Sequence, residues 1–269
     1  MNKNPVVNFF SVLGTKVPGA WLWRTFMSIA GLLFDTIYAA VRKGRSSNLS
    51  LTSQVNRQIL YTGVEAFWLV GIIAFLCGSA IIMQAMVNMP LLGVSEYFGR
   101  ILVIVVVGEL GPFITSLVVV GRSGSALATY IATMRVNREI DALEVMGIDP
   151  VQFLVLPALV GIVGSIICLN VYFVSIAIFG GLIVSKFIVD IPFVIFLAKV
   201  LDALTFKDIF FSVLKSVVFG LIVALVSSHC GLNARNIRMV PVAAIQAVVG
   251  AMFLTILFNL FLSFGYYVL

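Results

Sequence analysis

Two charged side chains lie inside stretches of the sequence that are otherwise apolar. Glu109 stands in the run VVVGELGPFITSLVVV, and Lys215 stands in a second apolar run over about residues 209–230. A charge within a bilayer is energetically costly, so such residues are paired, face a polar cavity, or serve a function. One acid and one base on two helices of a small bundle predict an ion pair or a shared polar cavity.

The Gly111-Pro112 pair that follows Glu109 leaves a structural alternative open. Proline has no backbone N–H and frees a carbonyl in the preceding turn. Glu109 is therefore interpreted either as a functional carboxylate or as a side chain that serves the backbone at this break.

Other residues with useful chemistry are scarce. Cys77, Cys168 and Cys230 fall in three different apolar runs, and His229 has no cysteine or carboxylate neighbours at ligand spacing. We expect no disulfide and no metal site. An intramembrane enzyme would need a nucleophile–base pair or a metal set, and the sequence offers neither, so we expect no catalytic residue.

The composition determines what kind of elements must position Glu109 and Lys215. Of the 269 residues, 61% are hydrophobic and 10% are charged, and the mean hydropathy is +1.16. A soluble domain has roughly 25% charged residues. The sequence therefore predicts an all-α integral membrane protein.

A helix crosses the hydrocarbon core in about 20 residues, so uncharged runs predict the spans. Five are predicted, over about 66–86, 101–121, 151–185, 209–230 and 239–269. We divide the chain into an N-terminal segment, 1–60, and a single five-span domain, 61–269.

The N-terminal segment contains WLWRTFMSIAGLLFDTIYAAVRKGR, residues 21–45. Arg24 and Asp35 leave too few uncharged residues between them to span a bilayer. Apolar residues at helical spacing with tryptophans and basic ends predict an amphipathic helix in the membrane interface. A sixth span is the alternative.

Lysine and arginine counts predict the orientation. With the N-terminus in the cytoplasm, segments 1–66, 121–150 and 231–241 place twelve of them inside, against four outside. We therefore expect a cytoplasmic N-terminus and an external C-terminus. This topology and anionic headgroups account for the net charge of +6, so no nucleic-acid partner is expected.

The connection after the second predicted span has a composition of its own. GRSGSA, 121–126, is small and flexible, and residues 128–147 then predict a helix with Gly147 as its C-cap. Its charged and apolar side chains predict a cytoplasmic docking face for a soluble partner: Arg138, Glu139, Asp141, Leu143, Glu144 and Met146. A surface helix resting on lipid is the alternative, which the acidic residues disfavour because the inner leaflet is anionic.

Several motifs in this order and spacing resemble the signature of the MlaE/YrbE permease family, the membrane subunits of MCE-type ABC transporters that move lipids across the bacterial envelope. The matching segments are Glu109–Pro112, Gly121–Ala126, Met134-Arg135, Glu139–Glu144, Met146–Pro150 and Lys215–Gly220. The sequence departs from the family at Tyr130, where many members have Glu, and at Gly108, where some have Arg. No role for a charge is carried over to those two positions.

The resemblance implies an interfacial N-terminal helix, five spans, and a cytoplasmic coupling helix between spans two and three. It implies a homodimer in the bacterial inner membrane, two cytoplasmic ATPases, a hexameric periplasmic MCE-domain protein, and a small cytoplasmic accessory subunit. The sequence shows no Gly-x-x-x-x-Gly-Lys-Ser/Thr phosphate loop. We therefore expect a non-catalytic chain without a cofactor, with ATP and Mg²⁺ bound by the ATPase.

The same resemblance implies a lipid substrate, and it sharpens the two interpretations of the intramembrane charges. Either Glu109 and Lys215 line the lipid pathway, with Lys215 attracting a phosphate, or they form a structural ion pair. A stand-alone ion-coupled secondary transporter with Glu109 as the proton site is the alternative function. It predicts an internal repeat, which the sequence does not show, and leaves the 128–147 helix without a purpose.

Overall fold

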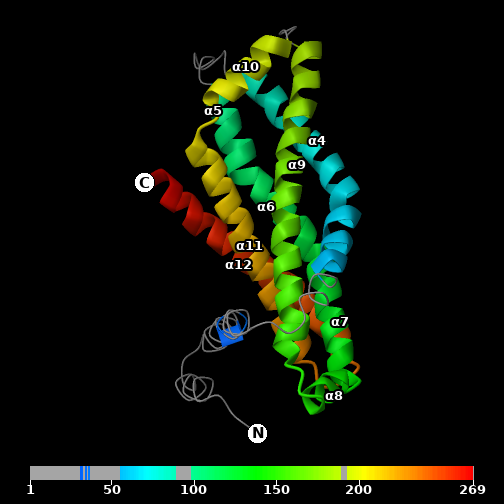
Figure 1. The fold of residues 1–269 in the computed structure, drawn as a ribbon. Coiled ribbons are helices and arrows are strands. Elements are labelled where there is room, and N and C mark those ends of the chain that lie inside the picture. The colour runs from blue at the N-terminus through cyan, green and yellow to red at the C-terminus, as the bar shows by residue number, and fades with distance from the viewer. Residues whose placement is uncertain are drawn as a thin grey trace, which may run out of the picture.

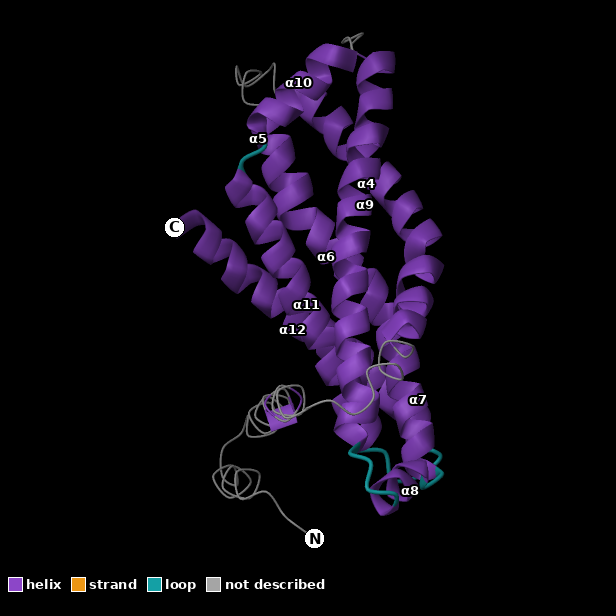
Figure 2. Cartoon of the chain, in the orientation of Figure 1, coloured by secondary structure: helices purple, strands orange, loops and turns teal. Residues whose placement is uncertain are grey.

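The computed structural model describes residues 55–88, 98–188 and 193–268, together with positions 31, 32, 34 and 36. Within these ranges every regular element is a helix. Figure 1 shows an elongated bundle in which the long helices run between two ends, and Figure 2 shows the short loops between them. The predicted all-α class is confirmed.

Five helices in the described ranges are long and apolar enough to cross a membrane: Val55–Ala85, Gly99–Val136, Val151–Phe187, Phe206–Leu232 and Met239–Tyr266. The chain is therefore a multi-pass membrane protein, as predicted. The interfacial helix predicted over 21–45 lies almost wholly outside the described residues. The division of the chain at residue 60 stays a prediction.

The spans are built from the following elements. Span one comprises η1 (Leu60–Val64) and α4 (Glu65–Asn88); span two comprises α5 (Phe98–Leu102), η4 (Val103–Leu110), α6 (Gly111–Val119), η5 (Val120–Gly124) and α7 (Ser125–Val136). Then follow the short α8 (Glu139–Val145), span three with η6 (Val151–Val155) and α9 (Leu156–Ile188), α10 (Phe193–Ala203), span four as α11 (Phe206–Leu232), and span five as α12 (Met239–Val268).

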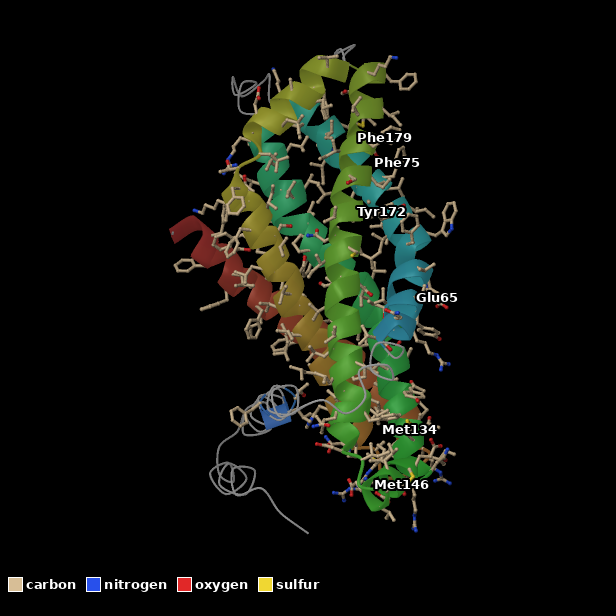
Figure 3. All side chains as sticks on the ribbon, viewed as in Figure 1. Glu65, Phe75, Met134, Met146, Tyr172 and Phe179 are labelled. Atoms are coloured by element: carbon tan, nitrogen blue, oxygen red, sulfur yellow. The ribbon has the colours of Figure 1, made fainter. Side chains whose placement is uncertain are left out.

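Helices α9 and α11 form the centre of the bundle. α4 packs along α9, and α11 lies against α9, α12, α7 and α6. The backbones of α4 and α9 approach closely, because a Cβ atom on Gly78 would overlap the backbone of Ala177, and one on Gly180 would lie 2.8 Å from the carbonyl oxygen of Phe75. Small residues permit such contacts between membrane helices. Figure 3 shows Phe75 and Phe179 at this crossing and Tyr172 further along α9.

The second span is longer than the sequence predicted. The prediction ended it near residue 121 and read GRSGSA as flexible, but the helix continues to Val136 through a π-helical turn, η5. In a bilayer a helix satisfies its own backbone, so small residues alone do not end it. Arg122 is accommodated because it donates to the carboxylate and the backbone carbonyl of Glu65 in span one.

The helix predicted over 128–147 is also wrong as a single element. It breaks at Arg138, which has a φ of 61° in the left-handed region. The chain therefore turns between α7 and α8. The predicted C-cap at Gly147 is confirmed: its φ is 76°, Ile148 N donates to Leu143 O, and Gly147 N donates to Glu144 O, which is the Schellman pattern.

Helix α12 diverges from the bundle toward its C-terminal end (Figure 1). In its most apolar stretch 17% of the residues are buried, against 56% for α11. Its small residues Ala243, Ala247 and Ala251 are buried inside this chain, where α12 packs on α11 and α7. The opposite face is apolar and exposed, and includes Ile245, Val249, Phe253, Leu260 and Phe264.

Candidate functional site

The structure brings the two intramembrane charges together. Lys215 Nζ on α11 lies 2.7 Å from Glu109 Oε2 at the end of η4. The side chain of Lys215 is 1% exposed and that of Glu109 is 27% exposed. The pair therefore has a buried cation and a carboxylate that reaches the surface of the chain.

A third helix completes this site. Ser263 Oγ on α12 donates to Glu109 Oε2 at 2.8 Å and accepts from Lys215 Nζ at 2.9 Å. The cluster of Glu109, Lys215 and Ser263 thus joins spans two, four and five, and we call it the charged triad. Ser263 was not predicted as a site residue, because a single serine in an apolar span carries no signal until its neighbours are known.

The Gly-Pro pair after Glu109 has a direct role in this site. Pro112 has no N–H to donate to the carbonyl four residues earlier, which is that of Gly108. Lys215 Nζ donates to Gly108 O at 3.1 Å. The helical turn before Pro112 therefore supplies an acceptor for the buried ammonium group.

The capping alternative for Glu109 is not what the structure shows. Helix α6 has no side-chain hydrogen bond at its N-terminus, and Gly111 N–H donates to Val106 O. Glu109 instead accepts from Lys215 and Ser263.

The three ammonium protons of Lys215 have three acceptors: Glu109, Ser263 and the Gly108 carbonyl. A lysine ammonium has three donors and no acceptor. The three donors of Lys215 are thus all in use, and any anion that binds Lys215 must displace one of these three acceptors.

A buried polar contact continues the triad into the bundle. Ser212 lies one turn before Lys215 and accepts a hydrogen bond from Asn170 Nδ2 at 2.9 Å. Asn170 and Ser212 are both buried. A Cβ on Gly111 would lie 2.5 Å from Asn170 Oδ1, so glycine at 111 permits α9 and span two to meet beside the triad.

A second cluster, which the sequence did not predict, lies nearer the α10 end of the same three spans. Arg100 donates to Asp208 at 2.5 Å and to Tyr266 at 3.0 Å, and the Tyr266 hydroxyl donates to Asp208. Asp208 is 1% exposed and closes a capping box with Thr205 at the start of α11. We call Arg100, Asp208 and Tyr266 the end clamp, because they hold the C-terminal part of α12 to spans two and four.

The two clusters lie at different levels along α11. Lys215 follows Asp208 by seven residues, about 10 Å along the helix. Glu109 and Lys215 were predicted to form an ion pair or to share a polar cavity, and the structure shows the ion pair.

The residues predicted to bind a soluble partner lie at the opposite end, on and beside α8 (Figure 3, where Met146 is labelled). Ile140 is buried and fixes α8 to the bundle, and Arg135 Nη1 contacts Asp141 Oδ1 at 2.8 Å. Leu143 is half-buried, and the other predicted members are exposed: Arg138, Glu139, Asp141, Glu144 and Met146.

Val145 was not among the predicted residues, but it is 89% exposed and adjoins Met146, which is 65% exposed. Exposed apolar side chains beside carboxylates are typical of a protein-binding surface. We call this set, Glu139–Met146, the α8 face.

Comparisons with known proteins cover both the charged triad and the α8 face. The sequence matches the family model described as Permease MlaE over residues 55–264. A probable ABC transporter permease protein of Synechocystis sp. is 30% identical over 90% of this chain and 91% of its own length. One of Rickettsia prowazekii is 28% identical over 77% of this chain and 80% of its own. The chloroplastic protein TRIGALACTOSYLDIACYLGLYCEROL 1 of Arabidopsis thaliana is 28% identical over 80% of this chain and 60% of its own length.

Proposed function

The chain belongs to the MlaE permease family and is the membrane subunit of an ABC transporter, and from that premise we propose that it moves phospholipid between its membrane and an MCE-domain partner. The name of the Arabidopsis relative is that of a glycolipid, which supports a lipid substrate. The observation that carries the proposal is the charged triad, a buried lysine held behind a part-exposed carboxylate within an apolar bundle.

The geometry suggests how the triad handles an anionic headgroup. Lys215 is neutralised by Glu109, and all three of its acceptors lie on other spans. A lipid phosphate that displaces Glu109 would gain a charge-assisted hydrogen bond to Lys215. Ser263 moves with α12, so separation of α12 from α11 would free one of the three Lys215 donors for the phosphate.

The α8 face is the proposed docking site for the ATPase. Its carboxylates and the apolar pair Val145 and Met146 suit a groove on a soluble protein. Because α8 connects spans two and three, a push on α8 is transmitted to the helix that carries Glu109. ATP and Mg²⁺ bind to the ATPase, and the present chain is a non-catalytic subunit.

The assembly we propose is a homodimer of this chain with two ATPases, a periplasmic MCE-domain hexamer and a small cytoplasmic accessory subunit. The exposed apolar face of α12 is available to lipid or to a second copy. The twelve-to-four distribution of basic residues favours a cytoplasmic N-terminus and a periplasmic C-terminus in the bacterial inner membrane.

The alternative is an ion-coupled secondary transporter in which Glu109 carries the proton. Reconstitution separates the two functions: proteoliposomes containing the chain and its ATPase are loaded with fluorescent phospholipid, and transfer to the MCE-domain protein is measured. We expect transfer with ATP and none with a proton gradient alone. Transfer that follows the gradient and ignores ATP would overturn the proposal.

A further inference from the structure

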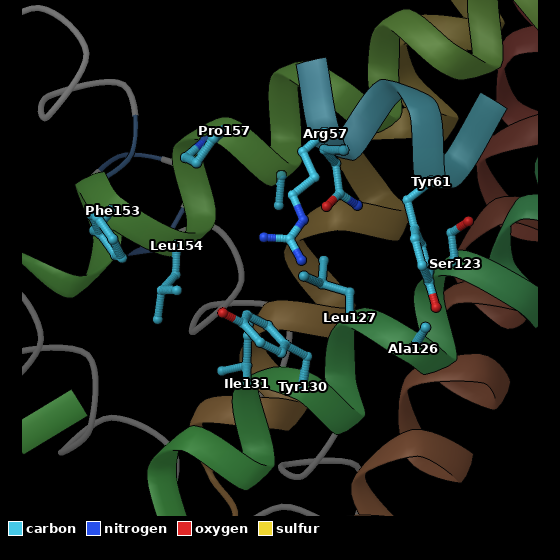
Figure 4. Close-up of a pocket in the computed structure, with 12 residues that line it drawn as sticks. Arg57, Tyr61, Ser123, Ala126, Leu127, Tyr130, Ile131, Phe153, Leu154 and Pro157 are labelled. Carbon is cyan, nitrogen blue, oxygen red and sulfur yellow. The ribbon is translucent and has the colours of Figure 1, made fainter. Parts of the chain in front are cut away.

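A cavity of about 470 Å³ lies at the α8 end of the bundle, between the beginning of span one, α7 and the beginning of span three (Figure 4). Ligand pockets have volumes of about 300–1,000 Å³. Its lining includes Arg57, Tyr61, Ser123, Tyr130 and Phe153.

This cavity is separate from the charged triad. Ser123 follows Glu109 by fourteen residues in span two, about 21 Å along the helix. The cavity is therefore at the other end of the bundle, beside α8.

One wall of the cavity offers an unused cation. Figure 4 shows the Arg57 guanidinium extending from its helix toward the space near Leu127 and Tyr130. Within the described ranges Arg57 forms no ion pair, whereas nearby Arg122 is neutralised by Glu65. No carboxylate is among the residues that line the cavity.

A buried hydroxyl adds a second observation. Ser123 is 2% exposed, and its Oγ has no hydrogen-bond partner in the described part of the chain. Buried polar atoms are normally satisfied, so the Ser123 hydroxyl still has a donor and an acceptor to offer beside the cavity. Tyr61 and Tyr130 are 53% and 57% exposed at the same cavity, and their hydroxyls add further donors.

The other wall is apolar. Leu127, Ile131, Phe153 and Leu154 contribute hydrocarbon and aromatic surface. A small free anion would use the guanidinium and the hydroxyls and leave this wall unoccupied. An amphiphile with an anionic head would use both walls.

The depth of the cavity suits a lipid headgroup. Tyr130 lies six residues before the end of α7 at Val136, and Phe153 lies two residues after span three begins at Val151. These positions are within about 9 Å of the helix ends, where tyrosine and arginine concentrate at membrane interfaces.

We propose that this cavity binds the headgroup of an anionic phospholipid from the leaflet on the α8 side, with Arg57 facing the phosphate and an acyl chain against Leu127 and Phe153. The identification of that leaflet as the cytoplasmic one rests on the proposed orientation. This leaflet is anionic, so the site would be supplied with ligand.

The test uses the full chain with its ATPase in phosphatidylcholine nanodiscs that contain a trace of phosphatidylglycerol carrying a diazirine near its headgroup. After illumination without nucleotide, mass spectrometry measures labelling of the peptide that contains Phe153. We expect Arg57→Gln to lower this labelling about tenfold, since one charge-assisted contact is worth about a factor of ten or more.

The matched control is Arg235→Gln, which removes an exposed arginine outside the cavity lining and should leave the labelling unchanged. Ala126→Phe fills the cavity without changing charge and should also abolish labelling. Equal labelling in the parent, Arg57→Gln and Ala126→Phe would overturn the site.

Two further arms identify the ligand. The corresponding phosphatidylcholine probe should label several-fold less, and equal labelling would remove the requirement for net negative charge. Millimolar glycerol 3-phosphate should not compete, and full competition would show that a soluble phosphate compound is the ligand. Because no ATP is used, failure here leaves the transport proposal intact, and failure of transport leaves this binding result intact.

Discussion

Removing the carboxylate of the charged triad should destabilise the protein more than removing its lysine. In Glu109→Leu, the ammonium group of Lys215, whose side chain is 1% exposed, loses its counter-charge and has no water to replace it. Removing one partner of a buried ion pair leaves the other charge uncompensated and lowers the free energy of unfolding by about 3–5 kcal/mol. In Lys215→Met, the remaining carboxylate is 27% exposed and can be hydrated or take up a proton, so we expect about 1–2 kcal/mol, comparable to one or two lost hydrogen bonds.

The double variant Glu109→Leu/Lys215→Met should be close to the parent, because a buried ion pair can be replaced by apolar groups at little cost. The assay is the free energy of unfolding in lipid micelles for the parent, both single variants and the double variant. Ser263→Ala serves as the control for a lost hydrogen bond, at about 1 kcal/mol. If Glu109→Leu is no worse than Lys215→Met, or if the double variant is the worst of the four, the reasoning from burial is wrong.

Three other perturbations test other parts of the structure. Gly78→Leu should destabilise the protein by about 1–3 kcal/mol or more in the same unfolding assay, because a Cβ at this position overlaps the Ala177 backbone. Gly164→Ala should be neutral or stabilising, because a Cβ there meets no described atom within 4 Å. Equal effects of the two substitutions would refute the close contact of α4 with α9. Tyr266→Phe should loosen the end clamp, so spin labels on α11 and α12 should report a longer or broader distance near the clamp. Phe264→Leu, on the exposed face of α12, should leave that distance unchanged. An unchanged distance in Tyr266→Phe would contradict the clamp. The double variant Glu139→Lys/Glu144→Lys reverses two charges on the α8 face and should lower the amount of ATPase that copurifies about tenfold or more. Asp202→Lys reverses an exposed charge at the other end of the bundle and should not lower it. Full copurification with the double variant would show that α8 is not the docking site.

The positions of the five spans were predictable because each is an apolar run of sufficient length with at most one charge. The ion pair of Glu109 and Lys215 was one of the two predicted arrangements, because an acid and a base in two apolar spans of a small bundle favour pairing. Their contact requires that α11 packs beside η4.

What the sequence could not supply was pairing between spans. Arg122 suggested the end of a helix, but Glu65 of another span neutralises it, so span two continues to Val136. Arg138 adopts a left-handed conformation that arginine rarely takes, and no local pattern predicts that break.

The remaining parts of the site depend on short polar side chains. Ser263 and Tyr266 lie in a span without charges, where a serine or a tyrosine is compatible with any packing. In the sequence, Asp208 is explained by the capping box that it forms with Thr205. Its ion pair with Arg100 is visible only in the folded structure. The roles of these residues become clear only when spans two, four and five are packed together and their side chains meet.

The most direct test of the proposed lipid pathway is ATP-dependent phospholipid transfer by the double variant Glu109→Leu/Lys215→Met, reconstituted with its ATPase and MCE-domain partner. If the pair only stabilises the bundle, this folded variant should transfer lipid at the rate of the parent. We predict that it retains ATP hydrolysis and loses most of its lipid transfer, while Lys199→Glu, an exposed reversal on α10, transfers normally. Transfer by the double variant at the parent rate would contradict the role of Lys215 in the lipid pathway.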